Sequence, residues 1–125
     1  MAEARPLARR RILIAEDNLL VAMQIEDSLR RLGAEPVGPV GRLSQALELA
    51  KREVLDGALL DVDLGGELVF PAAEVLEARR VPIIFATGHD GSALLSSRFA
   101  SHARLRKPYP EQELARLAMQ VFAPA

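Results

Sequence analysis

Hydrophobic residues gather in short runs that stop abruptly at polar residues, and this pattern recurs along the chain. Apolar runs of strand length, read as buried strands, cover 12–15, 58–60, 81–86 and, more weakly, 103–106. A further candidate over 35–40 contains Pro36 and Pro39, which cannot donate ladder hydrogen bonds. That strand must therefore be short and lie at an edge of a sheet.

Between these runs, apolar residues recur at helical spacing. The predicted helices cover 18–32, 44–53, 71–79, 92–99 (weak, because serines interrupt it) and 110–122. Gly33 ends the first helix, and Ser44 is the predicted N-cap of the second. Pro71 and Pro110 suit first helical turns, and a loop at 65–66 follows the third strand.

Five strands that alternate with five helices predict an α/β fold in which helices cover both faces of a parallel sheet. The 125 residues are enough for one domain, which we place at 11–123. The basic segment 1–10 is interpreted as a solvated lead-in, although Arg9, Arg10 and Arg11 could contact phosphates. No stretch has the length of a signal peptide's apolar region or of a membrane span.

Composition excludes several classes of function. The net charge of −1 gives no electrostatic reason to expect nucleic acid or membrane as a partner. The chain has no cysteine, which excludes disulfides and thiolate chemistry and fits a cytoplasmic location. The low aromatic content argues against a surface that stacks nucleic-acid bases.

Polar residues occur at the ends of four predicted strands, and they suggest one shared site. Glu16 and Asp17 follow the first strand, Asp61 the third, Thr87 the fourth and Lys107 the fifth. The carboxyl ends of parallel strands meet at one edge of a sheet, where ligands of this fold class bind. Clustered carboxylates favour a hard cation such as Mg²⁺, while a lysine and a hydroxyl suit phosphoryl oxygens. An aspartate in such a site can itself accept the phosphoryl group.

Each of these residues also has an ordinary structural explanation. Asp17 could cap the first helix, Thr87 could serve in a turn, and Lys107 could be a surface residue. His89 and His102 lack the partners of a metal site, and we interpret them as non-ligands. The ordered set at successive strand ends favours the shared site.

The ordered set resembles the receiver domain of two-component response regulators, and the resemblance covers essentially the whole chain. The stretches 85–88 (Phe-Ala-Thr-Gly) and 61–67 also resemble the FATGUY subgroup of receivers. The resemblance implies a flavodoxin-like (βα)5 sandwich whose five-stranded parallel sheet has the order 2-1-3-4-5. It also implies that the Lys107–Pro108 peptide bond is cis.

The resemblance implies a role for each site residue in a bacterial signalling protein. Asp61 would accept a phosphoryl group from a histidine kinase or a histidine phosphotransfer protein, with Mg²⁺ or alternatively Mn²⁺ bound. Asp17 would bind the metal directly, Glu16 would assist, and the backbone carbonyl of Asp63 would be a further ligand. Thr87 and Lys107 would hold phosphoryl oxygens.

One position departs from the family pattern. Many receivers carry an aromatic switch residue three positions before the lysine, where this chain has Arg104. We therefore expect the segment from Gly88 to Phe99 to reorder on phosphorylation instead. Asp63 and His89 flank the site and are candidates for tuning hydrolysis of the phosphoryl group.

Three further apolar residues of the first predicted helix lie partly off its buried face: Leu19, Leu20 and Met23. They are either core residues or, as the resemblance implies, the surface on which the kinase docks. Because little sequence follows the last helix, we expect a single-domain receiver, a monomer or weak dimer, that signals through an output partner or a phosphorelay.

A receiver would not be an enzyme, because it would assist only its own phosphorylation and dephosphorylation. Two other functions compete with this reading. Asp61 and Asp63 resemble the paired aspartates of haloacid-dehalogenase phosphatases, although that pair normally ends the first strand. A flavin or nucleotide binder of the same fold is the other alternative. It would need a glycine-rich phosphate loop after the first strand, where this chain has Glu16 and Asp17.

Overall fold

The structure is a computed structural model that describes residues 5–88 and 98–124. Segment 89–97 lies outside the described residues. His89 and most of the weak helix expected over 92–99 fall within it, so both stay predictions.

Five parallel strands form the main sheet, close to where the hydrophobic runs predicted them. They are β1 (Arg11–Ala15), β2 (Glu35–Val40), β3 (Gly57–Asp61), β6 (Ile83–Thr87) and β7 (Ala103–Arg106). The order across the sheet is β2-β1-β3-β6-β7, which is 2-1-3-4-5 when these strands are counted along the chain, as predicted. The strand that holds two prolines lies at an edge, as expected. The continuous apolar strands β3 and β6 are buried throughout.

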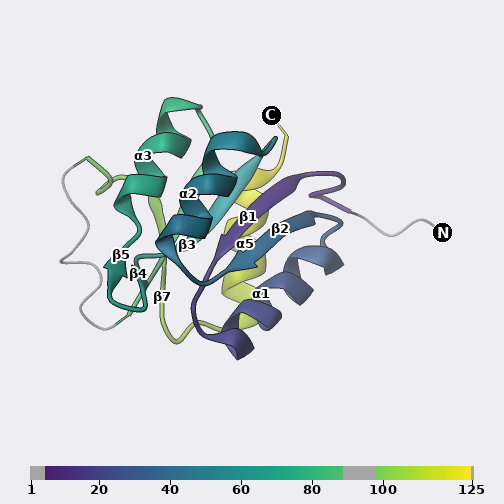
Figure 1. Ribbon diagram of the computed structural model, residues 1–125. Coiled ribbons are helices and arrows are strands. Elements are labelled where there is room, and N and C mark those ends of the chain that lie inside the picture. The colour runs from purple at the N-terminus through teal and green to yellow at the C-terminus, as the bar shows by residue number, and fades with distance from the viewer. Residues whose placement is uncertain (1–4, 89–97, 125) are drawn as a thin grey trace.

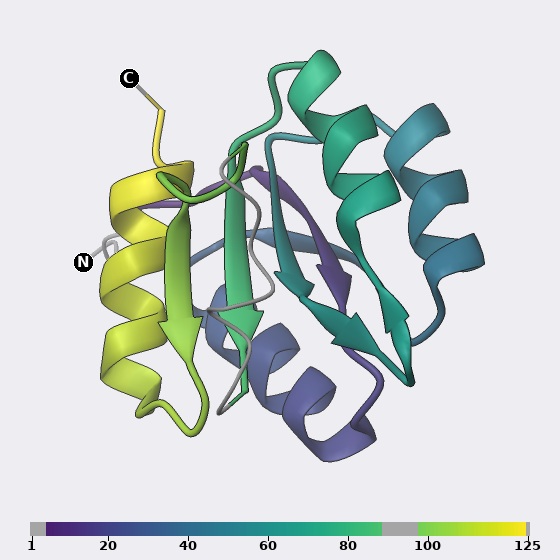
Figure 2. The same ribbon diagram turned by 90° about the vertical axis from the view of Figure 1, so that its left-hand side faces the viewer.

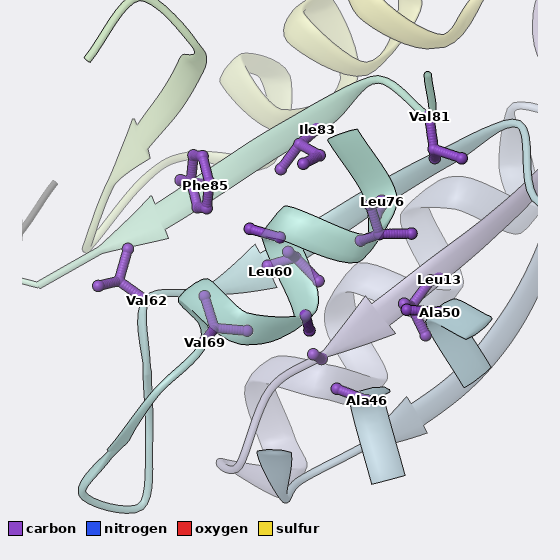
Figure 3. Packing of buried hydrophobic residues seen from close by; sticks show 14 of the residues in the cluster. Leu13, Ala46, Ala50, Leu60, Val62, Val69, Leu76, Val81, Ile83 and Phe85 are labelled. Carbon is purple, nitrogen blue, oxygen red and sulfur yellow. The ribbon is translucent and has the colours of Figure 1, made fainter. Parts of the chain in front are cut away.

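Helices cover both faces of this sheet and complete three layers (Figures 1 and 2). On one face lie α1 (Leu19–Arg31) and α5 (Glu111–Phe122), and on the other lie α2 (Leu43–Arg52) and α3 (Phe70–Ala78). Successive strand residues point to opposite faces, so Leu13 and Leu60 pack under α2 and α3, whereas Ile12 and Leu59 pack under α1 and α5. Figure 3 shows the first of these clusters, in which small residues of α2 lie close to the strands.

Two helix starts differ from the sequence-based expectation. The N-cap of α2 is Arg42, not Ser44, and it makes no side-chain cap bond. Helix α2 begins early because Leu43 packs against the buried core, and this contact outweighs the capping preference of serine. Pro110 is the extended N-cap of α5 and not part of its first turn.

The loop expected around Gly65 and Gly66 is a small antiparallel hairpin. Its strands are β4 (Asp63–Leu64) and β5 (Glu67–Leu68). Two residues per strand are too few to leave a hydrophobic pattern in the sequence. The two adjacent glycines were the available signal, since paired glycines favour two-residue hairpin turns.

The described part of segment 1–10, interpreted from the sequence as a solvated lead-in, is mixed: Arg5, Ala8 and Arg9 are exposed, whereas Leu7 is not. Leu7 is fully buried in the core beneath α1 and α5, and its N–H donates to the carbonyl of Leu32 at 2.9 Å. Arg10 pairs with Asp56 at 3.2 Å, and Arg11 pairs with Glu53 at 2.8 Å. Part of the basic segment is therefore anchored to the domain, because its single leucine is buried in the core.

Candidate phosphoryl-transfer site

The carboxyl ends of the parallel strands lie at one edge of the sheet, where the arrowheads of Figure 2 point. Five residues meet there and are called the acid edge below: Glu16, Asp17, Asp61, Thr87 and Lys107. Four of them end or directly follow β1, β3 and β6, and Lys107 directly follows β7. The structure thus brings together all five residues that the strand ends predicted.

Three carboxylates converge at the acid edge. Glu16, Asp17 and Asp61 each offer an oxygen, and these oxygens lie within 4.8 Å of one another. Glu16 and Asp61 are 3% and 6% exposed, whereas Asp17 is exposed. Two buried carboxylates and one exposed carboxylate form an oxygen-rich corner that is open to solvent on one side. Such an oxygen donor set fits Mg²⁺, which commonly takes one or two carboxylates and keeps several waters.

Lys107 lies between the two buried carboxylates. Its Nζ donates to Asp61 Oδ2 at 2.7 Å and to Glu16 Oε1 at 2.8 Å. Its backbone N–H donates to the carbonyl of Thr87 at 2.7 Å, so the residue is fixed at both ends. The peptide bond to Pro108 is cis, as the resemblance implied.

The charges at this edge shift two pKa values. Burial, with the negative charge of Asp61 adding to it, raises the pKa of Glu16 despite the hydrogen bonds from Lys107 and the Asn18 N–H. Burial alone would lower the pKa of Lys107, but hydrogen bonds to Asp61 and Glu16 outweigh it and raise the pKa. One ammonium faces three carboxylates, so the edge keeps an excess of negative charge that a cation would relieve.

Thr87 contributes a buried hydroxyl. The residue is fully buried, and its Oγ1 has no hydrogen-bond partner among the described residues. Leaving a buried hydroxyl without a partner costs about 1–3 kcal/mol, so such atoms commonly mark a place that a ligand fills. This orphaned donor ends a strand next to the one that ends in Asp61, and a hydroxyl of this kind suits a phosphoryl oxygen.

Asp17 does not cap the first helix. The N-cap of α1 is Asn18, whose side chain accepts from the Val21 N–H at 3.2 Å. The Asn18 N–H in turn donates to Glu16 Oε2 at 3.0 Å, so the cap also orients Glu16. This role of Asn18 was not among the predictions, although asparagine just before a helix is a standard N-cap signal. Asp17 is thereby left available at the acid edge.

The residues proposed for switching are less closely tied to the site. Gly88 is exposed, and a Cβ added there would meet no atom of residues 5–88 or 98–124 within 4 Å. Arg104 lies opposite Phe85 in the register of the neighbouring strands β7 and β6. The Arg104 Nη2 donates to the carbonyl of Ala100 at 2.6 Å. The guanidinium is half-buried and satisfied, so the charge stays out of the core.

A cleft of about 740 Å³ lies between α1 and the start of α5, next to the acid edge. Lys107 and Gly88 line one end, and Tyr109 lies along it. Tyr109 is half-buried, and burial together with the charge of Glu16 raises its pKa to about 12. Tyr109 was not among the predicted site residues, although its position two residues after Lys107 placed it near the site.

Several known proteins are similar to this chain in both sequence and fold. The chain is 42% identical to SdrG from Sphingomonas melonis Fr1, covering 89% of this chain and 95% of SdrG with a TM-score of 0.77. It is 31% identical to the receiver domain of sensor histidine kinase PA1611 from Pseudomonas aeruginosa PAO1, covering 90% and 97% with a TM-score of 0.77. That receiver was solved with a magnesium ion coordinated in its active-site cleft.

The curated relative PdtaR, a transcriptional regulatory protein of Mycobacterium tuberculosis, is 34% identical over 108 residues. The match covers 84% of this chain, which spans about half the length of PdtaR. None of the known family profiles matches the sequence.

The chain belongs to the response regulator receiver family, which the identities and coverage of SdrG and the PA1611 receiver show. The predictions of a receiver and of phosphoacceptor signalling are confirmed at this level, and the haloacid-dehalogenase alternative is not favoured. Among the described residues, no helix has the length and hydrophobicity needed to cross a membrane.

Proposed function

We propose that Asp61 accepts a phosphoryl group from the phosphohistidine of a histidine kinase or histidine phosphotransfer protein. The observation that carries this proposal is the Lys107 ammonium, which donates at 2.7 Å to the carboxylate of the buried Asp61. The orphaned hydroxyl of Thr87, at the end of the neighbouring strand β6, supports it. Phosphoryl transfer needs mainly positioning and charge neutralisation, and these groups supply both.

In the proposed reaction, a carboxylate oxygen of Asp61 attacks phosphorus while the phosphorus–nitrogen bond of the donor breaks. The electron pair of that bond stays on the imidazole nitrogen. Lys107 Nζ shifts from Asp61 to a phosphoryl oxygen, and the Thr87 hydroxyl donates to another. In this way the hydroxyl gains the partner that the described residues do not give it.

Asp17, Asp61 and the backbone carbonyl of Asp63 would hold Mg²⁺, or Mn²⁺ as an alternative, and Glu16 would assist. The bound cation supplies charge neutralisation for the incoming phosphoryl oxygens. The convergence of three carboxylate oxygens within 4.8 Å supports this assignment. The protein would promote only its own phosphorylation and dephosphorylation, in the cytoplasm.

The experiment is incubation with acetyl phosphate and Mg²⁺ followed by intact mass. We expect a gain of one phosphoryl group that is absent with a chelator and absent in Asp61→Asn. No gain in the wild type, or an equal gain in the variant, would refute the assignment. Steady release of phosphate from small phosphate esters would instead favour the phosphatase.

The proposed docking surface for the donor protein is the start of α1. Leu19 and Leu20 are each 71% exposed and Met23 is 54% exposed, which is costly unless a partner covers them. Alanine at Leu19 or Met23 should slow transfer from the kinase but leave phosphorylation by acetyl phosphate unchanged. Equal kinase-dependent rates in wild type and variants would remove this surface from the proposal.

A further inference from the structure

The hairpin formed by β4 and β5 leaves the sheet directly after Asp61 and returns at α3 (Figures 1 and 2). Its base is fixed: the Val69 N–H donates to the carbonyl of Val62 at 2.9 Å, and both valines are buried. Figure 3 shows these two valines at the two ends of the loop. Leu64 is also buried, at 2% exposure. The exposed tip is therefore mounted on a rigid base.

The turn at the tip has an unusual backbone. Gly65 and Gly66 have φ values of 61° and 97°, and both lie in the region that glycine favours. The Asp63 side chain closes this turn, because its Oδ1 accepts from the Gly66 N–H at 2.7 Å. Asp63 is exposed and its carboxylate is used within the hairpin.

The same hairpin bonds to one carboxylate of the acid edge and passes near another. The Asp63 N–H donates to Asp61 Oδ1 at 3.0 Å. At the tip, a Cβ added to Gly65 would lie 3.8 Å from Asp17 Oδ2. No hydrogen bond to the Asp17 side chain occurs among the described residues, so the hairpin is a neighbour of this carboxylate and not its bonding partner. The hairpin spans the gap from Asp61 to Asp17.

We propose that the Asp63 side chain is a positioning residue for the metal site and acts by holding this turn. The inference rests on the proposed function, in which Asp17, Asp61 and the Asp63 carbonyl bind Mg²⁺. A backbone carbonyl is a useful ligand only when its direction is fixed, and Asp63 fixes its own through the bond to Gly66. Mutating a group that orients a metal ligand in this way commonly lowers the metal affinity by about 10–100-fold.

The test is a calorimetric titration of the full chain with Mg²⁺ alone, which needs no phosphodonor. Asp63→Ala removes the bond to Gly66 and should weaken Mg²⁺ binding by about tenfold. Asp63→Asn keeps an oxygen acceptor for the Gly66 N–H and should recover most of that loss. Glu67→Gln is the matched control: it removes another exposed hairpin carboxylate and should change affinity by no more than about twofold.

Amide exchange gives a second readout without metal. Exchange of the Gly66 N–H should accelerate in Asp63→Ala and stay slow in Asp63→Asn. Gly66→Ala should weaken Mg²⁺ binding as Asp63→Ala does, because a φ of 97° is strained for alanine.

Wild-type affinity in Asp63→Ala would overturn the positioning role. So would equal weakening in Asp63→Ala and Asp63→Asn, which would mean that charge alone matters. A failure of the proposed metal site is distinct: it would appear as equal Mg²⁺ binding by wild type and Asp17→Asn.

Discussion

The two ends of the sheet both carry charged clusters, but the clusters are built differently. At the amino ends of the strands, Arg10 and Arg11 pair with three carboxylates at 2.8–3.3 Å, and these side chains are about a quarter to two-thirds exposed. At the acid edge, one ammonium serves two buried carboxylates, and the Thr87 hydroxyl has no partner among the described residues.

This difference separates a stabilising cluster from a functional one. Solvent-exposed, mutually paired charges cost little and contribute up to about 1 kcal/mol each. Buried charges of one sign in excess cost stability, and native proteins keep them mainly where a ligand needs them. Both clusters combine carboxylates with basic side chains, so it is burial and charge imbalance that support the acid edge as the proposed site.

The largest expected effect is on stability at the amino end. Leu7→Ala leaves a cavity beneath α1 and α5 and should lower the free energy of unfolding by about 3 kcal/mol in urea denaturation. Because Leu7 is remote from the acid edge, phosphorylation by acetyl phosphate should be unchanged. A loss below about 1 kcal/mol would mean that the N-terminal segment is a loose lead-in after all.

Lys107→Ala should have the next largest effect, because it leaves Glu16 and Asp61 buried without their shared cation. We expect the free energy of unfolding to fall by about 2 kcal/mol. This is less than the loss for a fully buried ion pair, because the Lys107 side chain is 26% exposed. Mg²⁺ should recover part of this loss, and phosphoryl uptake should fall even at saturating Mg²⁺. Undiminished uptake would exclude Lys107 from the transfer step.

Asp17→Asn should act in the opposite direction. It removes one carboxylate from a group with excess negative charge, so the metal-free protein should gain about 0.5 kcal/mol. The same variant should lose most of its Mg²⁺ affinity by calorimetry. A variant that is neither more stable nor weaker in metal binding would contradict the charge imbalance at the acid edge.

Tyr109 offers the smallest but most local test, because it is the only tyrosine in the chain. Its pKa is raised from 10.0 to about 12 by burial and then by the charge of Glu16. Stability from this shift is therefore complete below pH 10.0 and is lost as the pH rises toward 12. Absorbance titration of the phenol should show the raised pKa of Tyr109. The variant Glu16→Gln should lower that pKa. An ordinary titration near 10.0 would place the phenol in solvent.

Features of the fold and the site could be predicted where they leave a local pattern in the sequence, and not where they depend on tertiary packing. The main strands and the five acid-edge residues follow from apolar runs that end in polar residues, whereas the strand order was implied by the family resemblance. Leu7 could not be placed, because one leucine among arginines has no periodic pattern and its burial depends on tertiary packing. The same holds for the start of α2, where packing of Leu43 overrides Ser44, and for the hairpin that closes on Asp63.

The most direct measurement of the central claim locates the phosphoryl group. After reaction with acetyl phosphate and Mg²⁺, borohydride reduces an aspartyl phosphate to an alcohol, and peptide mass spectrometry identifies the modified residue. The account predicts reduction at Asp61 alone. Modification at Asp17 or Asp63, or an unmodified protein under conditions where Mg²⁺ binds, would contradict it.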